Sequence, residues 1–428
     1  MGVRGRLSRW SGGVIVAGLA IALCAGIFVT ASSAARSWPS HRGPSAAARR
    51  AAEARAITAQ RAVLAAGVTI APRDGTANVA LDVPVVVSTR SGGLSAVHVI
   101  STTGAVVAGR FVSSRLWVST APLAPSAVYA VRATVAHRNV KVTSTATFRT
   151  LAPSANVTAS IFPTEGMQVG VGQPVIVRFP FAITTARARA AALSHIDVHE
   201  SKPVAGGWYG FSNTELHFRP ALPWPAGDRV TVHANLGGWN AGNGMWGFGA
   251  QLVHFNIGDT HISIANLATD QMTVTDNGRV IATYPISGGR PTLPTMNGVH
   301  IVMDRESVVR MISSSNGIPV NSPDGYDELV YDDVHISDSG EYVHAAPWSV
   351  SSQGHTNVSH GCINLSPQNA TAFMEFSRIG DIVQVVGSPR PPARGDHGVM
   401  DWDTVWTAWT HVAAVYPPLP ARPAAHRK

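Results

Sequence analysis

Cysteine is almost absent from this chain, which has only two among its 428 residues. Cys24 lies within an apolar stretch near the N-terminus, and Cys362 is the only cysteine outside that stretch. Disulfide bridges, which need cysteines in pairs, are therefore not available to the folded domains. An isolated thiol is either an inert buried residue or a reactive one, and its neighbours in the sequence have to distinguish the two.

Charged residues are also scarce, at 14% of the chain, whereas glycine (40) and proline (28) are frequent. This composition, with many Val and Thr residues, favours short strands and turns over long helices. A chain of 428 residues is too long for one ordinary hydrophobic core. We therefore expect a mainly β protein of two to four domains.

The N-terminus combines a basic end with a long uncharged run. Arg4, Arg6 and Arg9 precede residues 12–31, which are all apolar or small and carry no charge. Such a run is long enough to span a bilayer and also resembles a long secretory signal. Residues 1–36 are thus interpreted as a signal peptide or a membrane anchor, and in both cases the rest of the chain is exported. We expect it in the cell envelope, at the outer face of the cytoplasmic membrane or in the cell wall.

The formal net charge of +8 fits an anionic envelope. Nucleic acid is not an expected partner, because the chain is exported and no basic run is interleaved with aromatic residues. Residues 37–66 are rich in Ala, Arg and Pro and are interpreted as a linker.

Residues 67–257 contain a weak internal duplication. The turn at Pro72 and the Val-rich strand after Pro84 are repeated, at nearly the same spacing, by the turn at Pro163 and the strand after Pro174. Strands of this kind separated by Pro and Gly turns suit a two-sheet sandwich. We expect two tandem immunoglobulin-like domains, at residues 67–152 and 153–257.

A third region, residues 258–387, shows its own strand and helix signals. Asn277-Gly278 between two alternating segments predicts a tight hairpin over residues 272–284. Ser366 followed by Pro367 predicts the start of a helix that ends before Gly380, and residues 381–386 form a closing strand. Residues 305–333 lack a regular pattern and are interpreted as a lid.

The C-terminal tail, residues 388–428, carries several tryptophans. Trp402, Trp406 and Trp409 lie at helical spacing, which predicts a short helix whose tryptophans dock onto an earlier domain.

Cys362 lies in the segment Ser359-His360-Gly361-Cys362-Ile363-Asn364, and His344 lies upstream. A thiol attacks as thiolate, and a neighbouring imidazole is expected to lower its pKa by forming a charged pair. His360 and the thiol point in parallel, whereas His344, from a separate adjacent strand, can approach the thiol directly and is the preferred base.

Gly361 lets the backbone turn tightly and direct N–H groups at an oxyanion. Ser359 and Asn364 are expected to brace this turn through hydrogen bonds. Metal binding by His344, His360, Cys362 and a carboxylate is the competing chemistry, but the spacing is not typical of a zinc site. We therefore expect neither a metal nor a cofactor.

These six residues, with Tyr342-Val343-His344 upstream, resemble the catalytic signature of the L,D-transpeptidases of bacterial cell walls, which have a YkuD-type catalytic domain. The resemblance extends over nearly the whole chain from about residue 67 and is closest to actinobacterial, mycobacterial-type members. It implies two tandem immunoglobulin-like β-sandwiches, then an L,D-transpeptidase-type β-sandwich catalytic domain with a short helix, and a C-terminal helical tail.

The resemblance also implies roles for individual residues. Cys362 would be the nucleophile, His344 its base, and the backbone carbonyl of Ala345 the group that orients the histidine. Many relatives have Ser where this chain has Ala345, which keeps the carbonyl but lacks the hydroxyl, and Asn364 fits the actinobacterial subgroup. A substrate-covering tyrosine would be Tyr326 or Tyr331, and Trp348 is a further substrate-binding candidate.

The implied reaction is acyl transfer on peptidoglycan stem peptides. The thiol would attack the amide between the third residue and D-Ala of a tetrapeptide stem, and the acyl group would pass to an amine of another stem to give a 3→3 cross-link. Carbapenems would acylate the same thiol. Transfer to water or to a protein amine would instead make an L,D-carboxypeptidase or a protein-anchoring enzyme, and a non-catalytic wall-binding protein is a further alternative.

Overall fold

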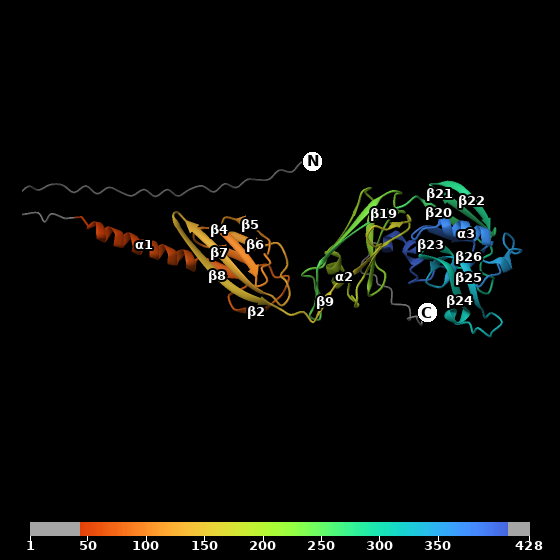
Figure 1. The fold of residues 1–428 in the computed structure, drawn as a ribbon, viewed down its shortest axis with the longest axis horizontal. Coiled ribbons are helices and arrows are strands. Elements are labelled where there is room, and N and C mark those ends of the chain that lie inside the picture. Colours follow the sequence, from red (N-terminus) through yellow and green to blue (C-terminus); the bar gives the residue numbers. More distant parts are fainter. Residues whose placement is uncertain (1–42, 410–428) are drawn as a thin grey trace, which may run out of the picture. The chain divides into compact units, whose positions relative to one another are not determined.

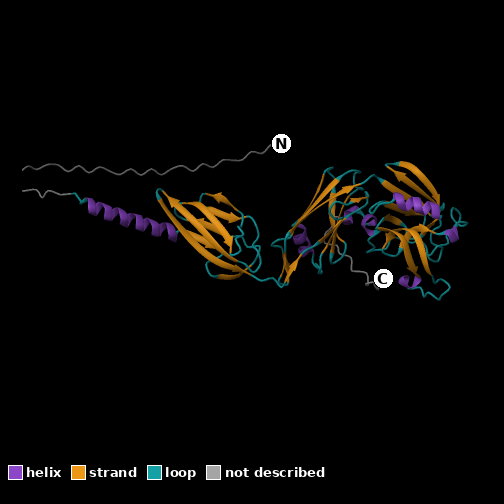
Figure 2. Cartoon of the chain, in the orientation of Figure 1, coloured by secondary structure: helices purple, strands orange, loops and turns teal. Residues whose placement is uncertain are grey.

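The computed structural model describes residues 43–409, in which strands predominate over helices (Figure 1, Figure 2). The segment interpreted as a signal peptide or membrane anchor lies outside the described residues. Within residues 43–409, no helix is both long enough and apolar enough to cross a membrane. Most of the predicted linker is a helix, α1 (Ala46–Ala66), because Ala and Arg are strong helix formers. Its Leu64 is buried in the core of the first sandwich.

The first sandwich consists of two four-stranded sheets, with strand orders β1-β3-β6-β5 and β2-β8-β7-β4. Trp117, Tyr129 and Phe148 are buried in the shared core, where the rings of Tyr129 and Phe148 stack with centroids 5.3 Å apart. The strands are β1 (Val68–Ala71), β2 (Thr76–Val79), β3 (Val86–Thr89), β4 (Gly93–Ser101), β5 (Gly109–Ser113), β6 (Leu116–Ser119), β7 (Val128–His137) and β8 (Val140–Thr150).

The second sandwich repeats this arrangement, with sheets ordered β10-β12-β15-β14 and β11-β19-β16-β13, and adds a small sheet β17-β18-β9. The prediction of two tandem sandwiches is confirmed. The elements are β9 (Ala155–Val157), β10 (Ser160–Phe162), β11 (Gln168–Val169), β12 (Val175–Arg178), α2 (Ala186–Leu193), β13 (Ile196–Glu200), β14 (Gly206–Gly210), β15 (Glu215–Pro220), β16 (Arg229–Asn235), β17 (Asn240–Gly242), β18 (Met245–Gly247) and β19 (Ala250–Ile257).

The third domain has a five-stranded sheet, β22-β21-β20-β28-β23, and a four-stranded sheet, β24-β25-β26-β27, which share one hydrophobic core. Its elements are β20 (His261–Asn266), β21 (Gln271–Asp276), β22 (Arg279–Pro285), β23 (Gly298–Ile301), β24 (Asp304–Ile312), η1 (Ser313–Asn316), β25 (Asp327–Ser337), β26 (Glu341–Ala345), η2 (Pro347–Ser349), β27 (Ile363–Leu365), α3 (Pro367–Phe376) and β28 (Ile382–Val386).

Local sequence signals in this domain are reproduced by the structure. Asn277 and Gly278 have φ values of 48° and 79°, as a primed two-residue turn requires, and they join β21 to β22. Helix α3 begins at Pro367, and the Ser366 side chain accepts a hydrogen bond from the backbone N–H of Asn369. The predicted hairpin and helix are therefore confirmed.

The predicted lid over residues 305–333 is wrong in extent. Most of this range belongs to β24 and β25, which pair as a long antiparallel hairpin, and only residues 313–326 lie between the two strands. The strand signal was missed because β24 is mostly exposed on both faces. A strand that buries neither face does not show the alternation of apolar and polar residues by which strands are recognised.

The second sandwich is joined to the third domain by backbone hydrogen bonds. The N–H groups of Gly170 and Gly172 donate to the carbonyls of Ile379 and Gly380, each at 2.8 Å. A Cβ atom at Gly170 would lie 2.2 Å from the backbone nitrogen of Asp381. Only glycine permits this close approach of the two backbones.

The C-terminal segment returns to the second sandwich as two short helices, α4 (Met400–Asp403) and α5 (Trp406–Trp409), rather than as one continuous helix. Trp402 Nε1–H donates to the Gly172 carbonyl at 2.7 Å, and Trp409 Nε1–H donates to the Gly207 carbonyl at 2.8 Å. The guanidinium of Arg219 lies 4.5–5.2 Å from the ring centroids of three tryptophans, which are Trp402, Trp406 and Trp409. Cation–π contacts and hydrogen bonds together hold this segment on the sandwich.

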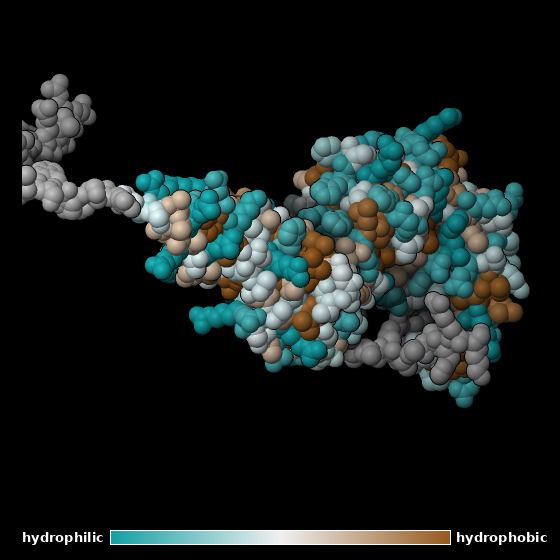
Figure 3. Space-filling view, turned by 60° about the vertical axis from the view of Figure 1, so that its left-hand side comes forward, coloured by the Kyte–Doolittle hydropathy of each residue, from teal (hydrophilic) through white to brown (hydrophobic). Residues whose placement is uncertain are grey.

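Exposed hydrophobic side chains are scattered over the described surface. On the face shown in Figure 3, hydrophobic residues lie between hydrophilic ones and do not merge into one continuous patch. Single exposed apolar residues are normal for a soluble surface, so hydropathy alone does not mark a binding site on this face.

Replacing Trp409 by Ala should destabilise the unit formed by the second sandwich and the C-terminal helices. The indole is fully buried, stacks on Tyr209 with centroids 4.8 Å apart and makes the hydrogen bond to Gly207. We expect the free energy of unfolding to fall by about 3–5 kcal/mol, measured by chemical denaturation. Val405→Ala is the matched control, because Val405 is 67% exposed. Equal stability of the two variants would contradict this role of Trp409.

Candidate active site

The predicted site residues lie on and beside two adjacent parallel strands, β26 and β27. Val343 pairs with Ile363 and His344 pairs with Asn364. The side chains of Val343 and Ile363 are fully buried in the domain core. Because side chains alternate along a strand, His344 and Asn364 lie on the opposite face of the sheet, and Cys362, two residues before Asn364, belongs to that face too.

His344 is buried and its ring is fixed by one hydrogen bond. Its Nδ1 lies 2.9 Å from the carbonyl oxygen of Ala345, which is the contact that the resemblance implies. Since a carbonyl can only accept, Nδ1 carries the proton and Nε2 keeps its lone pair. Burial lowers the pKa of His344 to about 4. At neutral pH the ring is therefore an uncharged base.

Cys362 is a half-buried free thiol whose Sγ lies 3.8 Å from the carbonyl oxygen of Gly340. Burial of the sulfur raises its pKa to about 12, and the nearby carboxyl groups of Glu341 and Asp333 add to the shift. Within residues 43–409, no hydrogen bond joins this thiol to His344. The expected thiolate–imidazolium pair is therefore wrong for this state, because burial penalises both charged forms.

Ser359 and Gly361 form the tight turn that presents Cys362. The Ser359 hydroxyl donates to the Cys362 carbonyl at 2.6 Å and accepts from the Gly361 N–H at 3.0 Å. Gly361 has φ = 131°, a conformation that favours glycine. Its expected role as an oxyanion donor does not match this structure, because the Gly361 N–H is already bonded to Ser359.

Asn364 is braced by residues that the sequence interpretation did not select. Its side-chain amide donates to the Ser349 hydroxyl at 3.0 Å, and its backbone exchanges hydrogen bonds with Ser287. Residues 287–290 lie outside the named strands and run beside the motif, where the Ser359 N–H donates to the Gly288 carbonyl. The two consecutive glycines at 288 and 289 were the available signal, since glycine weakens a strand.

His360 is poorly suited to act as the base, because its ring already takes part in a hydrogen bond. Arg290 donates to His360 Nε2 at 3.0 Å and also pairs with Asp324 at 2.7 Å. Burial and the neighbouring Arg290 charge lower the pKa of His360. Arg290 thus connects the motif to the loop between β24 and β25. Among the described residues, no hydrogen bond to the Nε2 atom of His344 is present, so of the two histidines His344 is the better candidate for the base.

The three candidate substrate-binding residues occupy different positions. Tyr326, at the end of the loop, lies against His360 with ring centroids 4.9 Å apart. Trp348 is 57% exposed and its ring centroid is 6.1 Å from that of His344. Tyr331 is 55% exposed on β25, where it pairs with Ala345. The structure therefore places Tyr326 in the loop between β24 and β25 and Tyr331 on strand β25.

Two buried carboxyl groups lie behind the motif. Glu341 accepts hydrogen bonds from the Met296 N–H at 2.8 Å and from Arg390 at 2.6 Å, and burial raises its pKa to about 7. Asp333 is fully buried and burial raises its pKa to about 7 as well. These groups oppose ionisation of the thiol, and nothing in the sequence pattern identified them.

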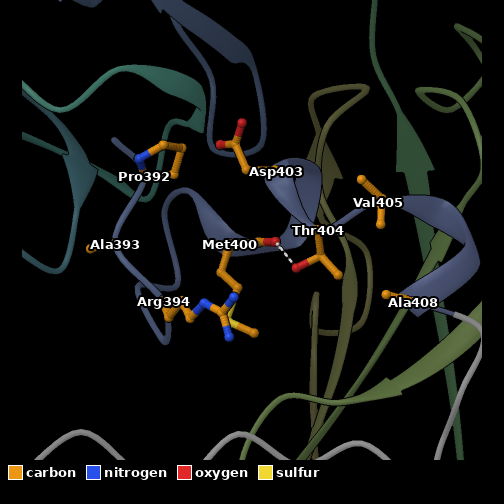
Figure 4. A pocket seen from close by; sticks show the side chains of 8 residues that line it. All are labelled: Pro392, Ala393, Arg394, Met400, Asp403, Thr404, Val405 and Ala408. Atoms are coloured by element: carbon orange, nitrogen blue, oxygen red, sulfur yellow. Dashed lines mark hydrogen bonds between the residues drawn. The ribbon is translucent and has the colours of Figure 1, made fainter. Parts of the chain in front are cut away.

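A pocket in the C-terminal segment is lined by neither cysteine nor histidine. It is lined by Pro392, Ala393, Arg394, Met400, Asp403, Thr404, Val405 and Ala408 (Figure 4). The Thr404 hydroxyl closes one wall by donating to the Met400 carbonyl at 2.7 Å. Asp403 accepts from the Val299 N–H at 2.9 Å and serves the packing of the C-terminal segment. Cys362 and His344 are therefore the stronger candidates for the active site.

Comparison with known proteins assigns both kinds of domain. A model of the bacterial Ig domain matches residues 76–240, a range that begins in the first sandwich and ends in the second. A model of the L,D-transpeptidase catalytic domain matches residues 260–385, which include both strands of the site.

Individual relatives extend the match over most of the chain. The chain is 40% identical to L,D-transpeptidase 2 of Mycobacterium tuberculosis over 337 residues, which cover 78% of this chain and 82% of that protein. It is 32% identical to L,D-transpeptidase 5 of the same species, over 83% of this chain and 79% of that protein. A solved structure of an L,D-transpeptidase in complex with imipenem is 36% identical, covers 55% of this chain and 99% of that one, and has a TM-score of 0.48. The chain therefore belongs to the L,D-transpeptidase family.

Proposed function

We propose that the protein is a peptidoglycan L,D-transpeptidase that forms 3→3 cross-links by cysteine acyl transfer. The observation that carries this proposal is the pairing of β26 with β27, which sets His344, a neutral base with a fixed tautomer, beside Asn364 of the motif that contains Cys362. Membership of the family supports the same reaction class. No cofactor is needed, because a thiol and an imidazole supply both the nucleophile and the proton transfer.

In the first half-reaction, Cys362 Sγ attacks the carbonyl carbon of the L,D-amide that joins the third residue of a tetrapeptide stem to D-Ala. Because the thiol and the imidazole are both neutral, the proton moves from sulfur to His344 Nε2 as the S–C bond forms. His344 then gives this proton to the leaving nitrogen, and the C–N bond breaks. The products are free D-Ala and a thioester on Cys362.

In the second half-reaction, the side-chain amine of a diamino acid on another stem attacks the thioester carbonyl. The amine loses a proton to His344 Nε2, the C–S bond breaks, and the sulfur takes the proton back. The Ala345 carbonyl holds the ring through both steps because Nδ1–H stays bonded to it. Carbapenems would enter through the first half-reaction, with the β-lactam carbonyl in place of the amide.

We place the enzyme in the cell envelope, exported across the cytoplasmic membrane. The arginines at positions 4, 6 and 9, followed by the uncharged residues 12–31, support this placement. The substrate chemistry supports it too, since cross-linked peptidoglycan lies outside the cytoplasmic membrane.

The pH dependence of acylation should distinguish a neutral pair from a preformed thiolate. His344 is deprotonated above its pKa of about 4, and Cys362 stays protonated up to about 12. The rate of carbapenem adduct formation, followed by intact mass, should therefore be nearly constant from about pH 5.5 to 9 and fall as the pH drops through about 4. A rate that rises tenfold per pH unit towards pH 8 would contradict this.

His344→Gln should slow the same acylation by about 10²–10⁴-fold, because it removes the proton acceptor. His360→Gln is the matched control, and we expect an effect of less than about tenfold, since Arg290 already occupies the His360 ring nitrogen. A larger effect at His360 than at His344 would mean that the base is misassigned.

Incubation with tetrapeptide-bearing muropeptides should yield 3→3-linked dimers and free D-Ala, as resolved by mass spectrometry. Cys362→Ala should yield neither. Tripeptide monomers without dimers would favour the carboxypeptidase alternative, and a stem-linked protein would favour anchoring. The absence of any product or adduct from the wild type would contradict the thiol mechanism and favour a non-catalytic wall protein.

Export can be tested in intact cells stripped of their outer wall layers. Protease added outside should degrade the domains from residue 67 onwards, whereas a cytoplasmic marker protein should survive. Protection of these domains until the membrane is broken would contradict the proposed location.

A further inference from the structure

Three ligand-type side chains converge where the second sandwich meets the third domain. Glu215 and His217 extend from β15, and His397 lies on the segment between β28 and α4. Glu215 Oε2 lies 3.3 Å from His217 Nε2 and 2.7 Å from His397 Nε2. The three atoms all lie within 4.8 Å of one another. They form a set of two imidazoles and one carboxylate, which is a common ligand set for zinc.

Each histidine is oriented by a second carboxylate on its far side. His217 Nδ1 donates to Asp401 at 2.8 Å, and His397 Nδ1 donates to Asp338. A hydrogen bond at Nδ1 directs Nε2 of each ring at Glu215. Carboxylates in this position are the usual outer partners of metal-binding histidines, where they fix the tautomer and raise the basicity of the ring.

The rings are also held rigidly by packing. Phe211 stacks on both imidazoles, with centroid distances of 4.3 Å to His217 and 4.3 Å to His397. The His217 side chain is fully buried, whereas His397 is partly exposed and gives access from solvent. Arg178 binds Glu215 through Oε1 at 2.5 Å, which leaves Oε2 directed at the two rings.

Negative side chains surround this centre. The carboxylates of Glu215, Asp338 and Asp401 all contact its two histidines. Arg178 contacts Glu215, and the charge of Arg219 acts on Asp401. Protons and a divalent metal compete for the same Nε2 lone pairs of His217 and His397.

We propose that Glu215, His217 and His397 form a site for a divalent transition metal of the zinc class, with water as a further ligand. Metal–ligand distances of about 2.0–2.2 Å require ligand atoms roughly 3.3 Å apart in a tetrahedral site. The separation between Glu215 and His217 already meets this, and His397 needs to withdraw by roughly half an ångström. The metal would link the second sandwich to the segment between β28 and α4.

The test is equilibrium dialysis of the full chain, stripped of metal by a chelator, against zinc alone, with bound zinc measured by mass spectrometry. We expect one equivalent of zinc per chain. His397→Gln and Glu215→Gln should each weaken binding at least tenfold, and Asp338→Asn should weaken it about 10–100-fold. The matched control is His254→Gln, which removes an exposed histidine that contacts only one carboxylate, Glu165.

Cobalt substitution identifies the ligands independently of variant stability. A site of nitrogen and oxygen ligands gives visible cobalt bands without an intense thiolate charge-transfer band, and Cys362→Ser should leave the spectrum unchanged. Circular dichroism establishes that each variant is folded. The proposal is overturned if the wild type binds no stoichiometric zinc, if Cys362→Ser abolishes binding, or if folded His397→Gln and Glu215→Gln variants both bind zinc as the wild type does.

Discussion

The site depends on the parallel pairing of β26 with the three-residue strand β27. One face of this pair, including Val343 and Ile363, is fully buried in the domain core. The other face carries His344 and Asn364, and the Ser359–Gly361 turn leads Cys362 onto it. A shift of one residue in this pairing would send the side chains of His344 and Asn364 into the core and the apolar ones out. Hydrophobic packing on one face therefore fixes the chemistry on the other.

Burial decides the protonation state of the site. A thiol among protein atoms, with Glu341 and Asp333 nearby, has its pKa raised to about 12, and the same burial lowers the pKa of His344 to about 4. A neutral pair is less reactive towards small oxidants and alkylating agents than a thiolate, because the thiolate is the nucleophile. At the proposed exported location, this state would protect the thiol until an acyl donor is bound. In the proposed mechanism, proton transfer to His344 Nε2 takes place only as the new bond forms.

The sequence predicted the parts of the fold that depend on local rules. The Asn277-Gly278 turn and the Ser366-Pro367 helix start were recognisable because Asn and Gly tolerate the positive φ of a primed turn, and Ser and Pro suit the N-cap and first position of a helix. Pairs of residues that meet only through the fold were not recognisable. The Arg290–His360 contact joins positions 70 residues apart, and Glu341 accepts a hydrogen bond from Arg390 of another segment. Strand β24 was missed because both its faces are exposed. The pKa of the Cys362 thiol was expected to be lowered but is raised, because the burial of a side chain cannot be inferred from its neighbours in the sequence.

The turn between β25 and β26 connects the candidate site with the contact between the second sandwich and the third domain. Asp338, which orients His397 at the joint, lies in the turn between β25 and β26, and Asp396 binds the same turn through Ser337 and Ser339. Gly340 ends this turn, and its carbonyl lies 3.8 Å from the Cys362 sulfur. A displacement of the joint would therefore move an atom that contacts the thiol. The second sandwich is therefore a structural support for the strands of the candidate site and not only a spacer. This role accounts for the carboxylate-bound histidines at the joint, where apolar packing alone could have held the two domains together.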